Sequence, residues 1–267
     1  MKGVVLSGGD LPKVAREIRS GIKRKIKEAG TRGAVVGLSG GIDSSVVATL
    51  TKNAGVNVIG LIMPETGVTK QRDIDDAIRL AEKLKIRYYV IELDRILTAV
   101  RNGFQWKDFP ENRLKSWGNV KARERMVMLY LAANLSNRIV LGTGNKTELL
   151  LGYFTKYGDG GVDFLPIRGL YKTQVQQLAK YLKVDEKICC KVPTAGLWVG
   201  QTDEGELGLK YRQMDEILHC ILDLELGVSE TAKKAKVSES EVRKIKRKIG
   251  ESAHKRAMPE IIHLKNL

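Results

Sequence analysis

The chain has 267 residues, of which 43% are apolar and 29% are charged, a composition that excludes a disordered or fibrous protein. Its apolar runs are shorter than the roughly 20 residues of a membrane helix, and its start is too weakly apolar for a signal peptide, so no membrane partner is expected. Three cysteines without metal-binding spacing exclude a disulfide framework and favour the cytoplasm. The net charge of +15 attracts polyanions, although such charge is usually solvated on helix faces.

The elements in chain order alternate between helices and strands. Residues 11–29 carry apolar side chains three or four apart, which predicts an amphipathic N-terminal helix. Nearly continuous apolar runs predict buried strands at 34–38, 56–63, 86–93 and 138–143. Helices are predicted between them, at 43–53, 73–84, from about Asp94, and at 119–137. This order predicts an α/β core over about 34–195, with a doubly wound, parallel, five-stranded sheet and helices on both faces.

The last part of the chain, about 205–258, is predicted to be mainly helical within a single domain that spans 1–267. Residues 225–249 resemble a helix-turn-helix, because a short helix and a basic helix are separated by Val-Ser-Glu-Ser. Ser-x-x-Glu is also simply a helix-capping box. We therefore favour a helical hairpin that packs on the α/β body, which makes nucleic acid an unlikely partner despite the positive charge.

The segment GLSGGIDSS at 37–45 carries the strongest chemical pattern in the sequence. Two glycines after a buried strand let the backbone turn close to an anion, and the following helix start offers free N–H groups and a positive dipole end. Asp43 beside phosphates indicates an intervening divalent cation. A second LSGG string at 6–9 lacks the Asp-Ser-Ser, so we interpret it as a turn into a helix with Asp10 as its N-cap.

SGGxDS resembles the phosphate loop of the PP-loop ATP pyrophosphatases, which cleave ATP between its α and β phosphates. Segments 119–126, 141–167, 191–208 and 252–259 occur in the order that resembles the NAD synthetase family in its ammonia-dependent, single-domain form. The resemblance implies ATP-dependent amidation of deamido-NAD by ammonia, through an NAD-adenylate, with release of AMP and pyrophosphate. It also implies a homodimer. No glutaminase segment is recognised before residue 34, so free ammonia, or ammonia from a separate protein, is expected.

The resemblance also assigns roles to individual residues. It implies that Mg²⁺ is held by Asp43 and Glu148, and that Asp43, Lys172 and Asp203 are catalytic. For ATP it implies a contact set of Gly37, Leu38, Ser39, Gly40, Gly41, Ile42, Asp43, Ser44, Ser45, Thr143, Lys172 and Thr194. For deamido-NAD it implies Arg123, Lys156, Asp163, His254 and Lys255. Cations suit this chemistry, because the carboxylate of one substrate and the phosphates of the other must be brought together.

Three aromatic residues, Tyr153, Phe154 and Tyr157, could stack on the nicotinate ring or belong to the core or a dimer interface. Loops 65–70 and 196–205 contain glycine and are expected to close over the adenylate and shield it from water. One alternative is another PP-loop adenylating enzyme, such as a tRNA-modifying enzyme, since the positive charge suits tRNA. A nucleotide-sensing DNA-binding protein is a second alternative, but it would have no use for Asp43 and Glu148.

Overall fold

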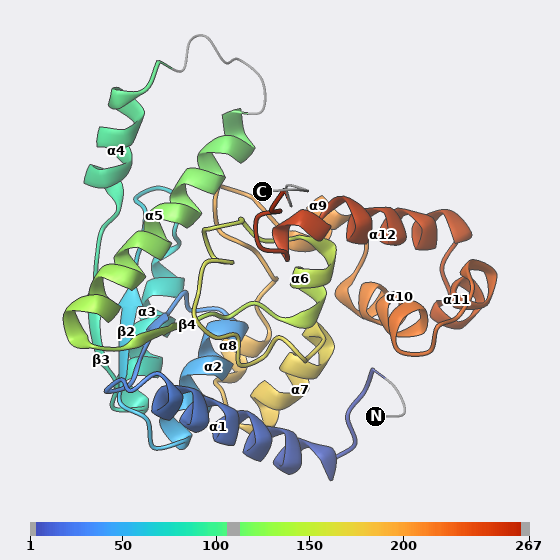
Figure 1. Cartoon of the computed structure of the whole chain (residues 1–267), viewed down its shortest axis with the longest axis horizontal. Coiled ribbons are helices and arrows are strands. Elements are labelled where there is room, and N and C mark those ends of the chain that lie inside the picture. The colour runs from blue at the N-terminus through green and yellow to red at the C-terminus, as the bar shows by residue number, and fades with distance from the viewer. Residues whose placement is uncertain (1–3, 106–112, 263–267) are drawn as a thin grey trace, which may run out of the picture.

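Four parallel strands in the order β3-β2-β1-β4 form the sheet of the α/β body, which lies on the left in Figure 1. The structure is a computed structural model that describes residues 4–105 and 113–262. The strands are β1 (Ala34–Gly37), β2 (Val58–Ile62), β3 (Arg87–Val90) and β4 (Ile139–Leu141). The predicted parallel α/β sheet is confirmed. Each of the four strands lies inside its predicted range and is shorter than predicted.

The edge beyond β4 differs from the predicted five-stranded sheet. Among the described residues four strands are regular, and the fifth position is taken by a single parallel bridge between Leu141 and Phe164. The Gly142 N–H donates to the Phe164 carbonyl at 2.9 Å, and the Asp163 N–H donates to the Val140 carbonyl at 3.1 Å. The segment 160–167 is rich in glycine and turns, which limits the pairing to this one residue.

Helices cover both faces of the sheet, as expected of a doubly wound fold. In chain order the helices of the α/β body are α1 (Asp10–Glu28), α2 (Ile42–Asn53), α3 (Gln71–Lys83), α4 (Asp94–Gly103), α5 (Arg113–Ser136), α6 (Lys146–Leu151), α7 (Lys172–Tyr181) and α8 (Glu186–Cys189). Gly9, and not Asp10 as predicted, is the N-cap of α1. The Asp10 carboxylate instead reaches back and accepts from the Ser7 hydroxyl at 2.7 Å.

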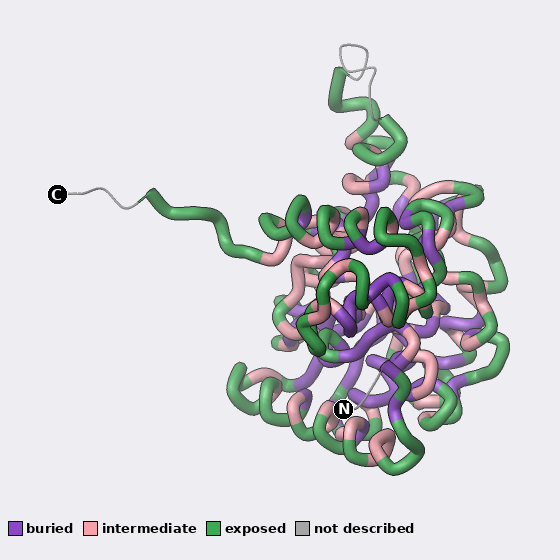
Figure 2. Tube along the Cα trace, turned by 90° about the vertical axis from the view of Figure 1, so that its right-hand side faces the viewer, coloured by how far each residue is buried: buried purple, intermediate pink, exposed green. Residues whose placement is uncertain are grey.

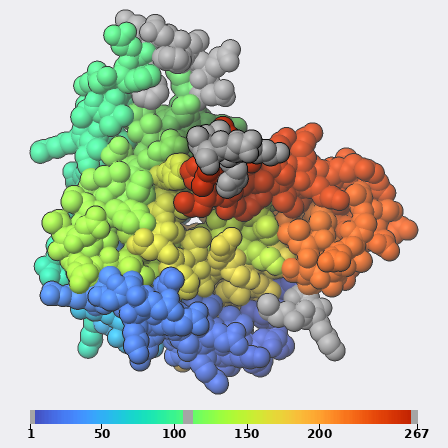
Figure 3. All heavy atoms as spheres, viewed as in Figure 1, coloured from blue at the N-terminus to red at the C-terminus, as the bar shows by residue number. Residues whose placement is uncertain are grey.

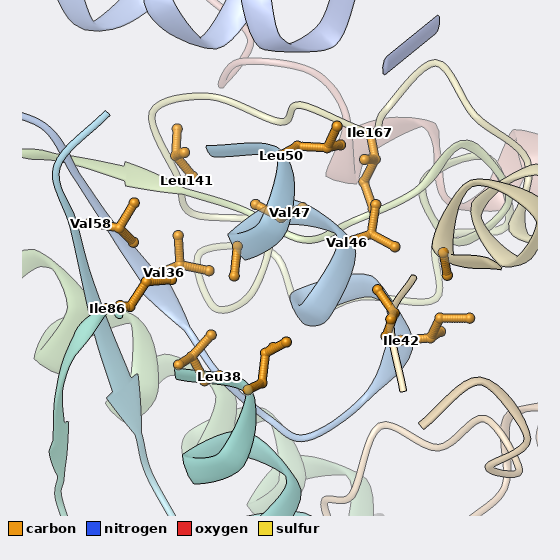
Figure 4. Packing of buried hydrophobic residues seen from close by; sticks show 14 of the residues in the cluster. Val36, Leu38, Ile42, Val46, Val47, Leu50, Val58, Ile86, Leu141 and Ile167 are labelled. Carbon is orange, nitrogen blue, oxygen red and sulfur yellow. The ribbon is translucent and has the colours of Figure 1, made fainter. Parts of the chain in front are cut away.

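Alternate residues of the central strand β1 face the two layers. Val36 lies in the cluster formed with α1, α2, α3 and α7, whereas Val35 lies in the cluster formed with α5. Figure 4 shows Val46, Val47 and Leu50 of α2 in the first of these clusters. Buried residues fill the interior, whereas the ends of α4 and α5 that project from the body are exposed (Figure 2). The rigid sheet and α2 therefore provide the base on which the loops are placed.

The strand order places two loops beside each other at the carboxyl edge of the sheet. The chain passes from β1 outward to β2 and β3, and then returns to the other side of β1 as β4. The loops that follow β1 and β4 therefore lie at the point where the strand order reverses, which is where ligands usually bind in open α/β sheets. Residues 38–41 and 142–145 form these two loops.

The C-terminal helices form a lobe beside the α/β body (Figure 3). They are α9 (Asp203–Leu207), α10 (Tyr211–Leu222), α11 (Val228–Ala235), α12 (Glu239–Glu251) and the 3₁₀ turn Ala253–Lys255. Buried residues of α11 and α12, including Ala232, Val242 and Ile245, pack in one cluster with α10. This packing confirms the helical hairpin. No helix within the described ranges combines the length and hydropathy that crossing a membrane requires.

Candidate active site at the switch point

The loop between β1 and α2 turns sharply at Gly40, whose φ is 72°. A Cβ atom there would lie 2.1 Å from the Asp73 carbonyl oxygen, so a side chain does not fit. The hydroxyls of Ser44 and Ser45 donate to the Gly41 carbonyl at 3.1 and 2.8 Å, which folds the loop onto the first turn of α2. Because α2 has 12 residues, its free N–H groups and positive dipole end make this loop suitable for a phosphate.

Lys191 joins this loop to helix α3. Its ammonium donates to the Gly40 carbonyl at 2.9 Å and to the carboxylates of Asp73 and Asp76 at 2.6 and 2.5 Å. Burial acts to raise the pKa of Asp76, but the ammonium of Lys191 and the nearby Arg79 lower it below its usual value. Lys191 was not among the predicted site residues, because its partners are distant in sequence.

Two predicted metal ligands meet at the switch point and share one ammonium group. The Lys172 Nζ, at the start of α7, lies 2.5 Å from Asp43 Oδ2 and 3.3 Å from Glu148 Oε1. The Lys172 side chain is 3% exposed, whereas the two carboxylate side chains are 18% and 17% exposed. The Asn145 side-chain amide donates to the other oxygen of Asp43 at 3.0 Å. The two carboxylates therefore face one cation site that solvent can reach.

The start of α6 fixes Glu148 by a reciprocal capping box. The Glu148 N–H donates to the Asn145 side chain at 3.1 Å, and the Asn145 N–H donates to Glu148 Oε2 at 3.2 Å. One oxygen of Glu148 is thus used on the backbone, and the other faces Lys172. Asn145 was missed by the sequence predictions, although Asn-Lys-Thr-Glu has the spacing of a capping box.

A buried carboxylate of α10, Asp215, supports the same corner. It accepts from the Thr147 hydroxyl at 2.5 Å and from the N–H and hydroxyl of Thr173, both at 2.8 Å. The Thr147 hydroxyl in turn accepts from the Lys172 N–H at 3.0 Å. Burial raises the pKa of Asp215. Asp215 therefore joins the first turns of α6 and α7, which carry Glu148 and Lys172.

The charges of this cluster depend on one another. Burial raises the pKa of Glu148 to about 8, with Lys172 opposing the shift and Asp43 adding to it. Burial alone would lower the pKa of Lys172, but the carboxylates of Asp43 and Glu148 raise it above its usual value. A divalent cation at this place would take over the role of the ammonium toward both carboxylates.

Asp203 lies on the far side of Lys172 and begins helix α9, so the predicted loop 196–205 ends as helix. The Tyr211 hydroxyl donates to Asp203 Oδ2 at 2.8 Å, and the Tyr211 ring lies 5.1 Å from the Lys172 ammonium. The second oxygen, Oδ1, is buried and has no hydrogen-bond partner among the described residues. Burial raises the pKa of Asp203, while its bond with Tyr211 and the charge of Lys172 act in the opposite direction.

The three aromatic residues left open by the sequence have different surroundings. Tyr153 is half-buried, and its hydroxyl donates to Glu206 of α9 at 2.6 Å. The Phe154 ring lies 5.4 Å from the Lys255 ammonium. Tyr157 is 53% exposed, so it does not belong to the core.

The two threonines predicted to contact ATP lie on the loops that border the cluster. Thr143 is half-buried in the turn after β4, and Thr194 is exposed, with its hydroxyl accepting from the Gly196 N–H at 3.1 Å. Within the described residues, neither hydroxyl bonds to the shared site of Asp43, Glu148 and Lys172.

Four of the residues predicted to bind the dinucleotide lie together. The Arg123 guanidinium donates to the Lys156 carbonyl at 3.3 and 3.4 Å, and the Lys156 ammonium donates to the His254 carbonyl at 2.9 Å. The Lys255 ammonium donates to the carbonyls of Gly152 and Phe154 at 2.7 and 2.8 Å. Burial lowers the pKa of Lys255.

The fifth predicted residue, Asp163, lies apart from these four, beside β4. Its carboxylate accepts from the Val140 N–H at 2.7 Å and from the Tyr130 hydroxyl at 3.0 Å. Burial and the bond to Asp163 raise the pKa of Tyr130 to about 12. One lone pair on each oxygen is thereby used inside the protein, so Asp163 is held rigidly in place.

The shared cation site has the chemistry that magnesium accepts. Among residues 4–105 and 113–262, no group of three or more acidic, histidine or cysteine side chains is arranged to hold a metal. Mg²⁺, however, usually takes one or two carboxylates and completes its shell with water and substrate phosphates. Asp43 and Glu148, already disposed around one cation beside the phosphate loop, fit this requirement.

Comparison with known proteins agrees with the geometry. The sequence model described as NAD synthase matches residues 14–259. An NH(3)-dependent NAD(+) synthetase of Archaeoglobus fulgidus is 45% identical over 257 residues, which cover 96% of this chain and 98% of that protein.

Two solved structures have the same fold. The structure of an NMN synthetase from Francisella tularensis has a TM-score of 0.85 and 35% identity, and the match covers 97% of this chain and 100% of that one. An NH3-dependent NAD synthetase from Campylobacter jejuni, in complex with nitrate, has a TM-score of 0.78 and 35% identity over 95% of this chain and 99% of its own. The chain therefore belongs to the NAD synthase family, whose members are ligases.

Proposed function

We propose that this protein amidates deamido-NAD to NAD with ammonia, in the cytoplasm, and that ATP activates the carboxylate as an NAD-adenylate. The observation that carries the proposal is the shared cation site of Asp43 and Glu148, which opens beside the glycine loop of 38–41. Binding of pyrophosphate at such a loop suits cleavage of ATP between its α and β phosphates. The 45% identity to an ammonia-dependent NAD synthetase supports ammonia as the nitrogen donor.

The reaction has two steps. An oxygen of the nicotinate carboxylate bonds to the α-phosphorus of ATP, and the bond to the departing pyrophosphate breaks. Ammonia then adds to the activated carbonyl carbon, loses a proton, and expels AMP, which leaves the amide. The first step brings two anions together, so cations at the site lower its barrier.

The residues of this chain have distinct roles in these steps. Asp43 and Glu148 would hold Mg²⁺, which supplies positive charge at the phosphates of bound ATP. The Lys172 ammonium, released from the two carboxylates, offsets charge on the α-phosphate. Asp203, one oxygen of which has no hydrogen-bond partner in the part of the chain that the structure describes, would accept the proton that the attacking nitrogen loses. Thr143 and Thr194 would contact ATP from the bordering loops.

The dinucleotide would bind along the cluster of Arg123, Lys156, His254 and Lys255. The side chains of Arg123, Lys156 and Lys255 donate to backbone carbonyls, and they would give charge-assisted hydrogen bonds to the diphosphate of the ligand. Asp163 would accept from a ribose hydroxyl of the same ligand.

A smaller substrate is the competing possibility. The Francisella tularensis relative with a TM-score of 0.85 is an NMN synthetase, a name that makes nicotinamide mononucleotide its product. Deamido-NMN has the same nicotinate carboxylate and lacks the adenylate half of deamido-NAD. The higher identity, 45%, to an NAD(+) synthetase favours the dinucleotide.

The exposed face of α5 and the edge strand β3 favour a homodimer. Val127, Leu131 and Leu135, four residues apart on α5, are 45%, 50% and 81% exposed, and Tyr89 and Val90 of β3 are 43% and 47% exposed. Leu131, Leu135 and both β3 residues line one groove of about 1020 Å³. Since α5 also carries Arg123, a second copy on this face would lie near the dinucleotide position. Leu131→Asp should convert the dimer to a monomer in sedimentation analysis, and a wild-type monomer would refute the proposal.

One assay tests the proposed reaction. The protein is mixed with ATP, Mg²⁺, ammonium and either deamido-NAD or deamido-NMN, and the products are separated. We expect NAD, AMP and pyrophosphate in equal amounts, with much slower turnover of deamido-NMN. Formation of ADP, or preference for the mononucleotide, would contradict the proposal.

A further inference from the structure

The loops that follow β2 and precede α9 meet on one lysine of α5. Lys121 Nζ lies 2.8 Å from Glu65 Oε2 and donates to the Leu197 carbonyl at 2.7 Å. The side chains of Lys121 and Glu65 are only 4% and 11% exposed. If one loop moved away alone, a buried charge would lose its partner, which is strongly unfavourable.

A second contact, which does not involve charge, holds the loop before α9 against α5. Gly118 lies one turn before Lys121 on α5 and is buried. A Cβ atom at Gly118 would lie 3.1 Å from the Trp198 ring and 3.3 Å from Leu197, so the loop rests directly against the helix backbone. The position of Leu197 is therefore fixed by both its carbonyl oxygen and its side chain.

Hydrogen bonds continue from Leu197 to helix α9, whose first residue is the Asp203 that lies near Lys172. The Leu197 N–H donates to Gln201 Oε1 at 2.7 Å, and Gln201 Nε2 donates to Glu206 of α9 at 2.9 Å. Helix α9 begins with Asp203. On the other side, Arg125, one turn after Lys121, donates to the Met63 carbonyl at the end of β2 at 3.3 Å. Lys121 thus stands where both loops attach to α5.

We propose that Lys121 is a positioning residue that joins loops 64–70 and 194–202, so that they cover the ATP side of the site as a single unit. The identity of the covered species, an acyl-adenylate, rests on the proposed function. Because both loops share one buried ion pair and its carbonyl contact, opening of either one exposes the other. Such coupling shields the activated carboxylate from water until ammonia reacts.

Amide hydrogen exchange in the ligand-free protein tests the coupling directly. Glu65→Gln changes only the first loop, yet it should raise exchange of amides 195–202 by about tenfold, because these depend on the same lysine. Lys121→Met should raise exchange in both loops. Lys115→Met, an exposed lysine on the same helix, and Glu92→Gln, an exposed carboxylate, are the matched controls and should change neither loop. Faster exchange confined to 64–70 in Glu65→Gln would overturn the proposal.

Product ratios test the consequence for the reaction. Wild type should release one AMP per NAD, and Lys121→Met should release several AMP per NAD, since water would reach the adenylate. The double variant Lys121→Met with Glu65→Gln removes both charges of the ion pair, so it should unfold at a higher temperature than Lys121→Met alone but remain uncoupled. An unchanged AMP-to-NAD ratio in folded Lys121→Met would overturn the positioning role. If neither the wild type nor any variant makes NAD, the proposed reaction is wrong. Amide hydrogen exchange in Glu65→Gln and Lys121→Met still decides whether the two loops are coupled.

Discussion

The proposed ATP side and the proposed dinucleotide side of the site use their positive charges differently. On the ATP side, the Lys172 ammonium is buried and already paired with two carboxylates. On the dinucleotide side, Arg123, Lys156 and Lys255 donate to backbone carbonyls, and within the described residues none of them has a carboxylate within ion-pairing distance. On the ATP side, the positive charge is already paired with carboxylates before a ligand binds. On the dinucleotide side, the positive charges have no carboxylate partner among the described residues and remain available to an anionic ligand.

This difference implies different modes of binding. A cation that enters the ATP side must displace an existing partner, because Asp43 and Glu148 already share an ammonium. An anion that enters the dinucleotide side has only weakly competing carbonyl oxygens to replace. Substitutions on the ATP side should therefore alter turnover and metal binding, and substitutions on the other side should alter substrate affinity.

Removal of the Asp43 charge should have the largest effect. Asp43→Asn keeps the size of the side chain but removes a metal ligand and a partner of Lys172, so kcat for NAD formation should fall by at least about a hundredfold. Asp75→Asn on α3 is the control, since the Asp75 carboxylate accepts from the Gln71 side-chain amide at 2.8 Å and is not part of the cluster of Asp43, Glu148 and Lys172. Near-normal kcat in Asp43→Asn would remove this carboxylate from the catalytic site.

Loss of the Lys172 ammonium should affect metal binding in the absence of ATP. Without this competing cation, Lys172→Met should bind Mn²⁺, used as a paramagnetic probe for Mg²⁺, about tenfold more tightly than wild type. Lys146→Met is the control, because Lys146 pairs with Asp223 at 2.8 Å and not with the shared carboxylates. Equal Mn²⁺ affinity in Lys172→Met and wild type would show that the ammonium and the metal do not compete.

A change on the dinucleotide side should be visible in KM. Arg123→Met removes a charged donor, so KM for deamido-NAD should rise by about tenfold or more, while KM for ATP stays nearly constant. Arg113→Met, on an exposed part of the same helix, should leave both constants unchanged. An equal rise of both KM values in Arg123→Met would mean that the two sides are not separate.

The smallest expected effect is on stability against pH in the metal-free protein. Burial raises the pKa of Glu148 from 4.5 to about 8, so between these values the folded state holds a proton that the unfolded state has lost. Stability should therefore fall as pH rises through this window. Lys172 has a raised pKa and loses its contribution only above 10.5. In EDTA, Glu148→Gln should show a shallower fall of Tm from about pH 5 to pH 8 than wild type; parallel curves would contradict the assignment.

Local patterns made part of this site predictable from sequence. Gly40, Gly41 and Asp43 follow one another directly after a buried strand, so their proximity required no knowledge of the fold. Glu148 and Lys172 were assigned through resemblance to a family, because nothing local shows that they meet Asp43. The capping box of Asn145 and Glu148 is also a local pattern, since the two residues are three apart in the sequence.

The supporting residues could not be predicted, because their partners come from distant segments. Lys191 reaches back to Gly40, Asp215 joins two helices, and Lys121 joins two loops, all through contacts that depend on tertiary packing. Taken alone, each is an ordinary charged residue on a predicted helix or loop. The fifth strand was expected as a regular element, yet packing of the glycine-rich segment near Phe164 leaves it as a single bridge.

Exchange of labelled pyrophosphate into ATP, measured without ammonia, tests most directly whether the dinucleotide is adenylated at the site of Asp43, Glu148 and Lys172. We expect exchange that requires both Mg²⁺ and deamido-NAD and that disappears in Asp43→Asn. Exchange that proceeds without deamido-NAD, or the absence of exchange in a protein that nevertheless makes NAD, would contradict an adenylate formed at Asp43, Glu148 and Lys172.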